Sequence, residues 1–427
     1  MKSGLSRSVS IVGVGCTRMG TLTESPWLAG LTENELFAWA SLEAMKDAGV
    51  EGKDIDILFH GQIGNVSFSR LLNPATAYQD WVGMHGKPCI HHEEACGTGY
   101  VGFNMAVMAV ASGACDIALT GGVEVLSTVA DAKKPNHIRE EASHTFKIGA
   151  IADILADPAY SRFPSNITHN SLFEYPPTDY MERYGITLEQ FDDMCNALAV
   201  QARRASSRHP LAFYQTEFEA MAKEAGYSDV MDYLRQDTYN KKRSKYYRKH
   251  HSFVTTDGAA AVIICTTEIA KTLKQQPIEV LGISGSSMDT RHPRNEEKIT
   301  ALSILKVYEK TGVKPCEIDL FQTQDLEIFD QIDSAEIAGY LPKGEGWRAA
   351  LDGRTGFDGD RPINTNGGRS GFGHAYAASG LADVGEVVQQ MRGQCGTRQV
   401  KKLPETALIR GIGGGQNATA AILRTVQ

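Results

Sequence analysis

The order of strand-like and helical segments constrains the fold of this chain most, because the same kind of alternation runs through it twice. The first round reads as a strand at 8–15, a helix at 33–49, a strand with its loop at 54–65, and a strand, helix and strand within 88–127. The second round reads as strands at 254–266, 277–287 and 317–325, a helix at 298–312, a glycine-rich loop entering a helix at 363–393, and two strands within 406–425. Two rounds in one chain predict an α/β fold with an internal duplication.

The length of 427 residues also favours two fused halves, because it exceeds what one ordinary hydrophobic core supports. A polar, irregular and mainly helical segment interrupts the alternation between the two rounds. The expected division is the first part of an N-terminal half at 1–128, a helical insertion at 129–253, the end of that half at 254–275, and a C-terminal half at 276–427.

Composition excludes several classes of protein. The formal net charge is −8, from 43 basic and 51 acidic residues, which argues against a nucleic-acid-binding protein. No apolar stretch reaches the ~18–20 residues of a membrane span, and the N-terminus shows no apolar secretory core. The eight cysteines form no Cys-x-x-Cys pair and no zinc-type cluster with histidine. We therefore expect reduced thiols, a cytoplasmic location and no metal site in this chain.

One cysteine lies where a strand-like run gives way to a long helix, in HHEEACGTGY at 91–100. A thiol at a helix N-terminus experiences the positive end of the helix dipole, which lowers its pKa. Gly97 and Gly99 permit a sharp turn and leave room for a substrate. Cys96 is thus a candidate nucleophile, although a buried core thiol remains the alternative on this pattern alone.

Two glycine-rich loops in the second round could join it. NTNGGRSGFGHAYAASG, at 364–380, would present His374 in a cleft before a helix, whereas a core histidine is the alternative. GIGGGQNA, at 411–418, is a turn between strands that can offer backbone N–H groups as an oxyanion hole. No Lys-Ser or Lys-Thr follows it, so a Walker-type phosphate loop is excluded.

The helical insertion carries the strongest basic cluster, KKRSKYYRKHH at 241–251. Such a cluster can be a solvated helix face or an anion site for the phosphates of a nucleotide-like carrier, and the sequence leaves both open. The candidate phosphate-binding side chains are Lys241, Lys242, Arg243, Lys245 and Arg248.

Taken together, these motifs resemble the thiolase superfamily. EACGTGYVGFNMAVMAVASGACDIALTGGVEVLS is similar to the stretch around the thiolase nucleophile. The His374 loop resembles the Asn-x-x-Gly-Gly…Gly-His-Pro loop, GIGGGQNA resembles the Cys-x-Gly-Gly-Gly turn, and TTDGAAAVI matches a further common stretch. Within the superfamily, QTQDLEIFDQIDSAEIAGYLPKGEG at 322–346 resembles the sterol-carrier-protein type. The resemblance implies two duplicated βαβαβαββ halves in a five-layered αβαβα architecture with an inserted helical loop domain.

The resemblance also implies a reaction and its residues. Cys96 would attack a 3-oxoacyl-CoA, a C–C bond would break, and CoA would then take the acyl group from sulfur. His374 would activate the cysteine, and the backbone N–H groups of Cys96 and Gly413 would form an oxyanion hole, where one donor is worth ~3 kcal/mol of barrier. Coenzyme A is thus a substrate, and no cofactor metal is expected here.

Three departures from the family pattern affect the site. Ala375 replaces the proline after the loop histidine, and Gln324 replaces a histidine, which leaves a hydrogen-bonding group that cannot titrate. Gly411 replaces the acid/base cysteine that protonates the leaving carbanion. We expect His60 to substitute for that acid, with a surface-loop histidine as the alternative. The weaker candidates are His144, His250, His251 and Glu94.

The predicted function is a thiolase-type acyl-CoA C-acyltransferase for a bulky or aromatic substrate. 2-Benzoylsuccinyl-CoA, cleaved to benzoyl-CoA and succinyl-CoA, is one example in the superfamily. The alternatives are C-acylation of a phenol, a steroid side-chain retro-aldolase, and a non-enzymatic acyl-CoA-binding scaffold. By the same resemblance, we expect a homodimer or tetramer and a small partner protein with a zinc ribbon and an oligonucleotide-type barrel. Any zinc would then belong to that partner.

Overall fold

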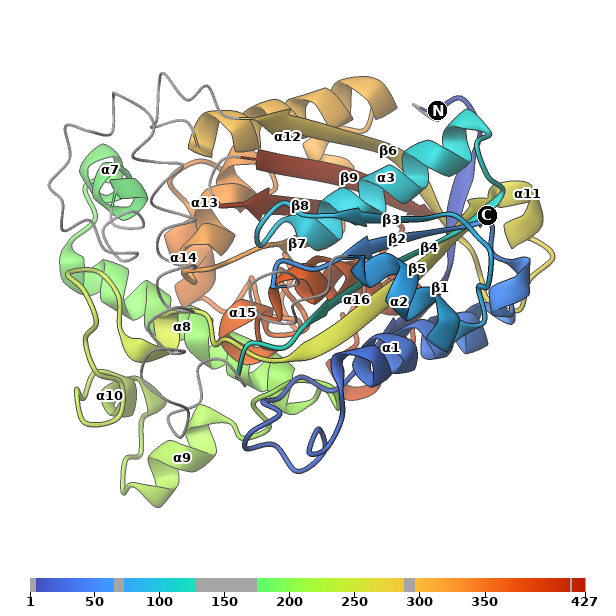
Figure 1. Ribbon diagram of the computed structural model, residues 1–427. Coiled ribbons are helices and arrows are strands. Elements are labelled where there is room, and N and C mark those ends of the chain that lie inside the picture. Colours follow the sequence, from blue (N-terminus) through green and yellow to red (C-terminus); the bar gives the residue numbers. More distant parts are fainter. Residues whose placement is uncertain (1–4, 65–72, 128–174, 288–295, 415–416, 427) are drawn as a thin grey trace, which may run out of the picture.

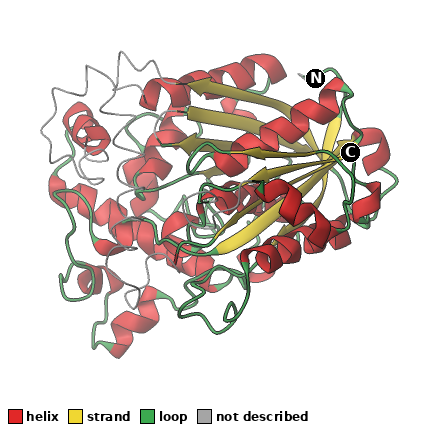
Figure 2. Cartoon of the chain, in the orientation of Figure 1, coloured by secondary structure: helices red, strands yellow, loops and turns green. Residues whose placement is uncertain are grey.

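A computed structural model describes residues 5–64, 73–127, 175–287, 296–414 and 417–426 (Figure 1). Its strands form a nine-stranded mixed sheet in the order β3-β2-β4-β5-β1-β6-β9-β8-β7 (Figure 2). The strands of the first half are β1 Val9–Cys16, β2 Ile57–Gly61, β3 Cys89–His92, β4 Ile117–Glu124 and β5 Gly258–Thr266. Those of the second half are β6 Ile278–Ser287, β7 Leu320–Thr323, β8 Thr406–Gly413 and β9 Asn417–Thr425.

The predicted duplication is present in the strand pairing. In the first half β2 pairs parallel with β4, β4 antiparallel with β5, and β5 antiparallel with β1. In the second half β7, β8, β9 and β6 repeat this series in the same senses. The two halves join where β1 pairs antiparallel with β6. Each half also has a register shift at the same place, between Ile11 and Gly13 in β1 and between Val280 and Gly282 in β6.

Helices cover and separate the two halves of the sheet. The principal helices are α1 Glu33–Ala48, α3 Thr98–Ser112, α12 Glu296–Thr311 and α16 Ser379–Met391. The outer helices pack on their own halves, α1 on β1, β4 and β5, and α12 on β6, β8 and β9. The inner helices α3 and α16 pack on each other and on strands of both halves. This is the five-layered αβαβα arrangement that the resemblance implied.

Local sequence explains where these helices begin and end. Thr32 and Glu35 form a reciprocal capping box at the start of α1, and Gly49 ends that helix in the left-handed conformation. Helix α3 has almost no polar face, because it lies in the inner layer, and Gly113 ends it in the same way. Apolar side chains from α3 and α16 share one hydrophobic core with the inner strand faces, while α1 belongs to a separate outer core.

A helical region lies between β4 and β5. Its described helices are α7 Tyr175–Tyr184, α8 Leu188–Ser207, α9 Phe218–Glu224 and α10 Val230–Leu234. The longest of them, α8, packs against two short helices of the second half, α14 Gly346–Leu351 and α15 Gly368–Gly371. The remaining α-helices of the described chain are α2 Pro74–Gln79, α11 Thr267–Ala270 and α13 Asp330–Ile337.

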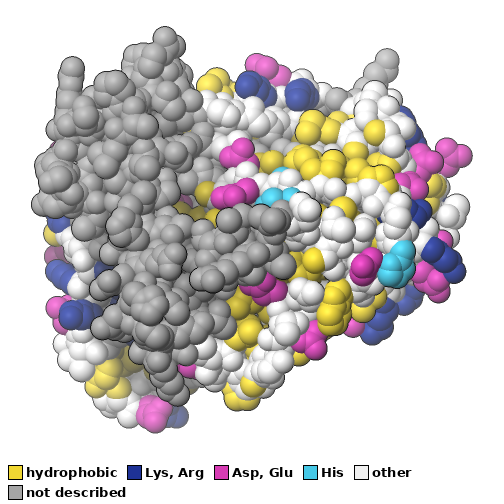
Figure 3. All heavy atoms as spheres, in the orientation of Figure 1, with side chains coloured by type: hydrophobic (Ala, Val, Ile, Leu, Met, Phe, Trp, Pro, Cys, Tyr) yellow, Lys and Arg dark blue, Asp and Glu magenta, His cyan; other side chains and the backbone are white. Residues whose placement is uncertain are grey.

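Two surface features bear on association. Strand β3 is an edge strand of the sheet, and its Ile90 is exposed. Hydrophobic side chains also gather over the region of α3 on the face seen in Figure 3. Met108, which lies in α3, is 54% exposed. No helix in the described ranges combines the length and apolar character that a membrane crossing requires.

Glycines in β1 let α1 approach the sheet, and this contact gives a first test. A Cβ at Gly15 would overlap the backbone carbonyl of Ala40, so Gly15→Ala should lower the free energy of unfolding by about 3 kcal/mol in urea denaturation. Gly385 in α16 is the matched control, because its Cβ would meet only Val14 at 3.7 Å. Gly385→Ala should leave stability unchanged or raise it by up to about 1 kcal/mol. Equal effects at both positions would contradict the packing described here.

Candidate active site

A tight turn presents Cys96 at the start of α3. Ala95 adopts a positive φ of 46°, which is uncommon for a residue with a side chain and marks a sharp change of direction. The Thr98 hydroxyl holds this turn, because it donates to the Ala95 carbonyl at 2.6 Å and accepts from the Glu94 N–H at 2.8 Å. The turn is closed by the Gly97 N–H, which donates to the Glu94 carbonyl at 2.9 Å. Cys96 keeps part of its surface exposed.

The ionisation of Cys96 differs from the prediction. Burial raises the pKa of the Cys96 thiol to about 12, and the charge of Arg369 opposes this rise only in part. The expected lowering of the pKa by the helix terminus is therefore wrong, because loss of hydration outweighs it. Cys96 rests as a thiol at neutral pH, so a base must remove its proton before it can attack.

The C-terminal glycine turn touches the Cys96 turn directly. A Cβ at Gly97 would lie 2.9 Å from the Gly413 nitrogen, and a Cβ at Gly413 would overlap the Glu94 carbonyl. Only residues without side chains permit this approach of two backbones. The structure thus brings together Cys96 and Gly413, the two residues whose N–H groups were predicted to form an oxyanion hole.

The His374 loop reaches the same place from the second half. His374 pairs with the segment before β5, because its N–H donates to the Val254 carbonyl at 2.8 Å and its carbonyl accepts from the Thr256 N–H at 3.0 Å. The next residues pack on the first turn of α3, where a Cβ at Gly99 would lie 2.6 Å from the Ala377 carbonyl. The loop that carries His374 therefore packs against the start of α3, next to the Cys96 turn.

The imidazole of His374 is held firmly. Its Nδ1 lies 3.0 Å from the Ser379 hydroxyl, and its ring stacks on Tyr376 with centroids 4.4 Å apart. His374 has no exposed surface, whereas the sequence predicted an imidazole open to a cleft. The prediction missed this burial because it depends on ring contacts with Tyr376 and with Phe253, which lies far from His374 in the sequence.

Gln324 lies at the end of β7, beside the glycine turn. Its side-chain oxygen accepts a bond from the Ile412 N–H at 3.4 Å, and its main-chain carbonyl accepts from Arg410 at 3.1 Å. The Gln324 Nε2 is buried and has no partner among the described residues. A buried amide with unused donors can bind an acceptor on a ligand.

The structure corrects the expectation for His60. Its ring contacts Phe37 and Tyr78, which belong to the outer core with α1, so it lies on the opposite face of the sheet from α3. Burial, together with His91 and His92, holds the pKa of His60 well below its usual value. His60 is therefore neutral, and it lies on the wrong face of the sheet to protonate a leaving group beside Cys96.

Two of the weaker candidates, His250 and His251, are engaged within the helical region. His251 accepts from the Arg248 N–H and bonds Asn196 within the helical region, and the His250 ring packs on Phe218. Glu94 supplies only its backbone to the Cys96 turn. His144 lies outside the described residues.

The position of the absent acid cysteine is filled by another side chain. A Cβ at Gly411 would overlap the ring of Tyr100, which lies in the first turn of α3, four residues after Cys96. The Tyr100 hydroxyl donates to Asp383 and accepts from Arg369 at 2.8 Å. Because this hydroxyl is engaged and burial holds its pKa well above the usual value, Tyr100 does not replace the lost thiol as an acid.

Two further titratable groups interact electrostatically with Cys96. Glu124, at the end of β4, has no exposed surface, and burial holds the pKa of its carboxyl well above the usual value. Burial also raises the pKa of Tyr376, with a smaller contribution from the neighbouring Cys96. The sequence contained both residues within recognised motifs, but no pattern linked either side chain to Cys96.

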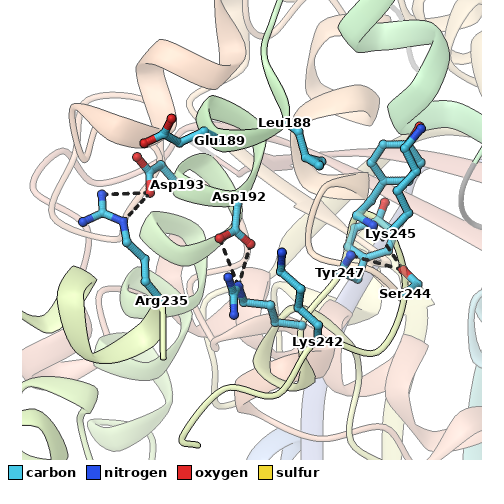
Figure 4. A pocket seen from close by; sticks show the side chains of 11 residues that line it. Leu188, Glu189, Asp192, Asp193, Arg235, Lys242, Ser244, Lys245 and Tyr247 are labelled. Atoms are coloured by element: carbon cyan, nitrogen blue, oxygen red, sulfur yellow. Dashed lines mark hydrogen bonds and ion pairs between the residues drawn. The ribbon is translucent and has the colours of Figure 1, made fainter. Parts of the chain in front are cut away.

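Three of the five predicted phosphate-binding side chains line a cavity of about 440 Å³ in the helical region (Figure 4). Lys242, Lys245 and Arg248 contribute to its wall, but so do Glu189, Asp192 and Asp193. Arg248 is buried and committed to acidic partners, because it bonds Asp192 at 2.7 Å and Asp237 at 2.8 Å. Lys241 and Arg243 are exposed and do not line the cavity. The two lysines are thus the basic groups of the cluster best placed to meet a ligand.

Comparison with known proteins agrees with this geometry. Residues 9–206 match the family model of the thiolase N-terminal domain, and residues 285–425 match that of the thiolase C-terminal domain-like family. An acetyl-CoA acetyltransferase of Methanothermobacter thermautotrophicus is 29% identical, over 97% of this chain and 98% of its own. The benzoylsuccinyl-CoA thiolase subunit BbsB of Thauera aromatica is 26% identical, over 97% of both chains.

A solved structure shows the same fold. The Ltp2-ChsH2(DUF35) aldolase superposes with a TM-score of 0.75 at 21% identity, over 99% of both chains. The family models, the relatives and the duplicated five-layered fold agree with one another. The chain belongs to the thiolase superfamily and is an enzyme of the acyltransferase class.

Proposed function

We propose that this chain is an acyl-CoA C-acyltransferase that works through an acyl group on Cys96. The observation that carries the proposal is the meeting of three segments, the Cys96 turn, the Gly413 turn and the His374 loop, which come from both halves of the chain. Each segment supplies one element of acyl transfer, namely the nucleophile, the oxyanion donors and the base.

The reaction follows from these positions. His374 takes the proton of the Cys96 thiol, and the thiolate attacks the 3-oxo carbonyl carbon of the acyl-CoA. The N–H groups of Cys96 and Gly413 stabilise the oxyanion that forms. Collapse of this intermediate breaks the C2–C3 bond and leaves the acyl group on sulfur. The leaving group is the enolate of the shortened acyl-CoA, which takes up a proton. CoA then attacks the thioester and removes the acyl group.

The proton for the enolate needs a source other than a cysteine at Gly411. Burial holds the pKa of Glu124 and that of Tyr376 above their usual values, and both groups interact electrostatically with Cys96. We assign the donor to this pair rather than to His60, because His60 lies across the sheet. Gln324, with its unused amide donors, is placed to bind a carbonyl oxygen of the substrate.

A bulky or aromatic acyl group is the proposed substrate class. The full-length similarity to a benzoylsuccinyl-CoA thiolase subunit supports it, as does the loss of the acid cysteine at Gly411. The similarity to an acetyl-CoA acetyltransferase makes transfer of an acetyl group the alternative to transfer of a bulky or aromatic acyl group. A panel of 3-oxoacyl-CoAs with CoA would separate them, and faster turnover of acetoacetyl-CoA than of aromatic substrates would contradict the aromatic assignment.

A partner protein and self-association also belong to the proposal. BbsB is named a subunit, and the solved relative is named for two components, Ltp2 and ChsH2(DUF35). The exposed Ile90 on edge strand β3 and the exposed Met108 on α3 support an interface between copies of this chain. Zinc, if the assembly holds it, would belong to the partner, and a cytoplasmic location stays a prediction.

Acyl trapping on Cys96 tests the function directly. Incubation with benzoyl-CoA or acetyl-CoA should add the mass of one acyl group to the intact chain, and peptide mapping should place it on Cys96. Cys96→Ala should abolish the adduct, whereas Cys316→Ala, which removes an exposed thiol, should leave it unchanged. An adduct that persists in Cys96→Ala would overturn the proposed nucleophile.

Charge reversal at the cavity tests CoA binding. Lys242→Glu combined with Lys245→Glu should raise the KM for CoA by roughly tenfold with little change in kcat. The reason is that contacts to the phosphates of CoA stabilise the bound ground state and the transition state equally. Lys271→Glu makes the same type of charge change at an exposed residue outside the cavity and should have little effect. An equal rise of the KM for CoA in the double variant and in Lys271→Glu would indicate a general effect of surface charge rather than a CoA-binding site.

The close contact between Gly411 and the Tyr100 ring can be tested by measuring the free energy of unfolding. Gly411→Cys should lower the free energy of unfolding by about 1–3 kcal/mol, because the new side chain overlaps the Tyr100 ring. Adding Tyr100→Leu should recover part of that loss, so that the two changes are not additive. The control is Gly285→Cys in β6, where a Cβ has its nearest neighbour at 3.8 Å and should cost little. Strict additivity would contradict the contact.

A further inference from the structure

Positive backbone φ values mark the segments that meet at the site. Among the described residues, three that are not glycine adopt them, namely Ala95 at 46°, Asn364 at 48° and Tyr376 at 33°. The first lies in the Cys96 turn, and the other two lie in the loop that carries His374. Residues with a side chain seldom adopt this conformation, and it persists where the surroundings enforce it, often at functional sites. Each of the three therefore needs a restraint that holds it there.

Ala95 is held against its own conformational preference. Ala95 and Cys96 are the two central residues of a turn that the Gly97 N–H closes on the Glu94 carbonyl at 2.9 Å. Only the first central residue has a positive φ, which is the pattern of a type II′ turn, where glycine normally occupies that position. Asparagine enters this region more readily than other residues with side chains, whereas alanine is destabilised in it.

The Thr98 hydroxyl supplies the restraint. It donates to the Ala95 carbonyl at 2.6 Å and accepts from the Glu94 N–H at 2.8 Å, so it bonds the strained residue and the residue before it. The Thr98 side chain is fully buried, so water does not compete for these two bonds. Thr98 is itself fixed by His92, whose Nε2 donates to the Thr98 carbonyl at 3.1 Å.

The peptide unit that Thr98 anchors is the one that carries the Cys96 N–H. A peptide unit is planar and trans, so its carbonyl and its N–H point in opposite directions. A bond that fixes the Ala95 carbonyl therefore also fixes the direction of the Cys96 N–H. The same turn touches the C-terminal glycine turn, because a Cβ at Gly413 would overlap the Glu94 carbonyl. Rotation at Ala95 would thus disturb both proposed donors of the oxyanion hole.

We propose that Thr98 is a positioning residue for Cys96, in which its hydroxyl anchors the Ala95–Cys96 peptide unit and aims the Cys96 N–H for the reaction. The proposal rests on the proposed function, because it takes Cys96 as the nucleophile and its N–H as an oxyanion donor. Such a donor acts only at hydrogen-bond distance from the developing charge, so a small rotation weakens it. Thr98 acts through the backbone and needs no contact with the substrate.

Thr98→Val tests the anchor, because it nearly keeps the shape of the side chain and removes the hydroxyl. Acylation of Cys96 by saturating acetyl-CoA or benzoyl-CoA, measured by rapid quench, should slow by about tenfold, with the apparent Kd of the acyl-CoA unchanged. Thr98→Ser keeps the hydroxyl and should stay within about threefold of the parent rate. Thr120→Val is the matched control, since Thr120 is equally buried and its hydroxyl has no partner among the described residues. An unchanged rate in Thr98→Val, or an equal loss in Thr120→Val, overturns the proposal.

The strain at Ala95 gives a second test, which does not depend on the folding of Thr98→Val. Glycine adopts a positive φ without steric cost, so Ala95→Gly should lower the equilibrium constant of unfolding by about threefold in urea denaturation. Ala106→Gly, at a buried alanine within helix α3, should raise that constant. Adding Ala95→Gly to Thr98→Val should restore acylation by about threefold, because the productive turn then costs less. A less stable Ala95→Gly protein, or recovery of stability without recovery of acylation, contradicts the proposal.

Amide hydrogen exchange separates failure of this proposal from failure of the proposed function, since it uses no acyl substrate. In Thr98→Val the Glu94 N–H loses its acceptor, so it should exchange about tenfold faster, whereas Thr98→Ser should keep its protection. Unchanged exchange in Thr98→Val contradicts the anchor. If exchange is faster and acylation is as fast as in the parent, the positioning role alone is refuted. If the parent itself forms no acyl-enzyme, the proposed function fails.

Discussion

The contact between the two halves of the chain, made through α3 and α16 in the inner layer, is the constraint on which the site depends. Neither half contains the site alone, because Cys96 comes from the first half and His374 and Gly413 come from the second. Glycines at 97, 99 and 413 let the backbones of the halves approach to contact distance. The inner layer therefore fixes both the core and the chemistry.

Burial then decides how the site can work. The same packing that brings the three segments together buries most of the Cys96 surface and raises the pKa of its thiol, so the thiolate has to be formed by a base. It also holds the pKa of Glu124 and that of Tyr376 above their usual values. A water-poor site of this kind makes each hydrogen-bond donor and each charge count for more than it would in solvent.

Sequence patterns predicted much of this architecture. Alternation of strand and helix predicted the duplication, and the glycine-flanked Cys96 and His374 loops marked two segments that the fold brings together. Three features escaped prediction because they depend on which side of a strand a residue faces or on contacts between distant segments. The His60 side chain faces the outer layer, although its neighbours along the strand face the inner layer. Tyr100 fills the space beside Gly411, and Arg369 pairs with Asp383, and both contacts join residues far apart in the sequence.

The central claim is that Cys96 carries the acyl group through the reaction. Rapid-quench measurement of CoA release, with acyl-CoA as the donor and no acceptor present, tests this most directly. We expect a burst of about one CoA per chain, followed by a slow phase set by hydrolysis of the thioester. Steady release without a burst, or a burst of the same size in Cys96→Ala, would contradict the acyl-enzyme.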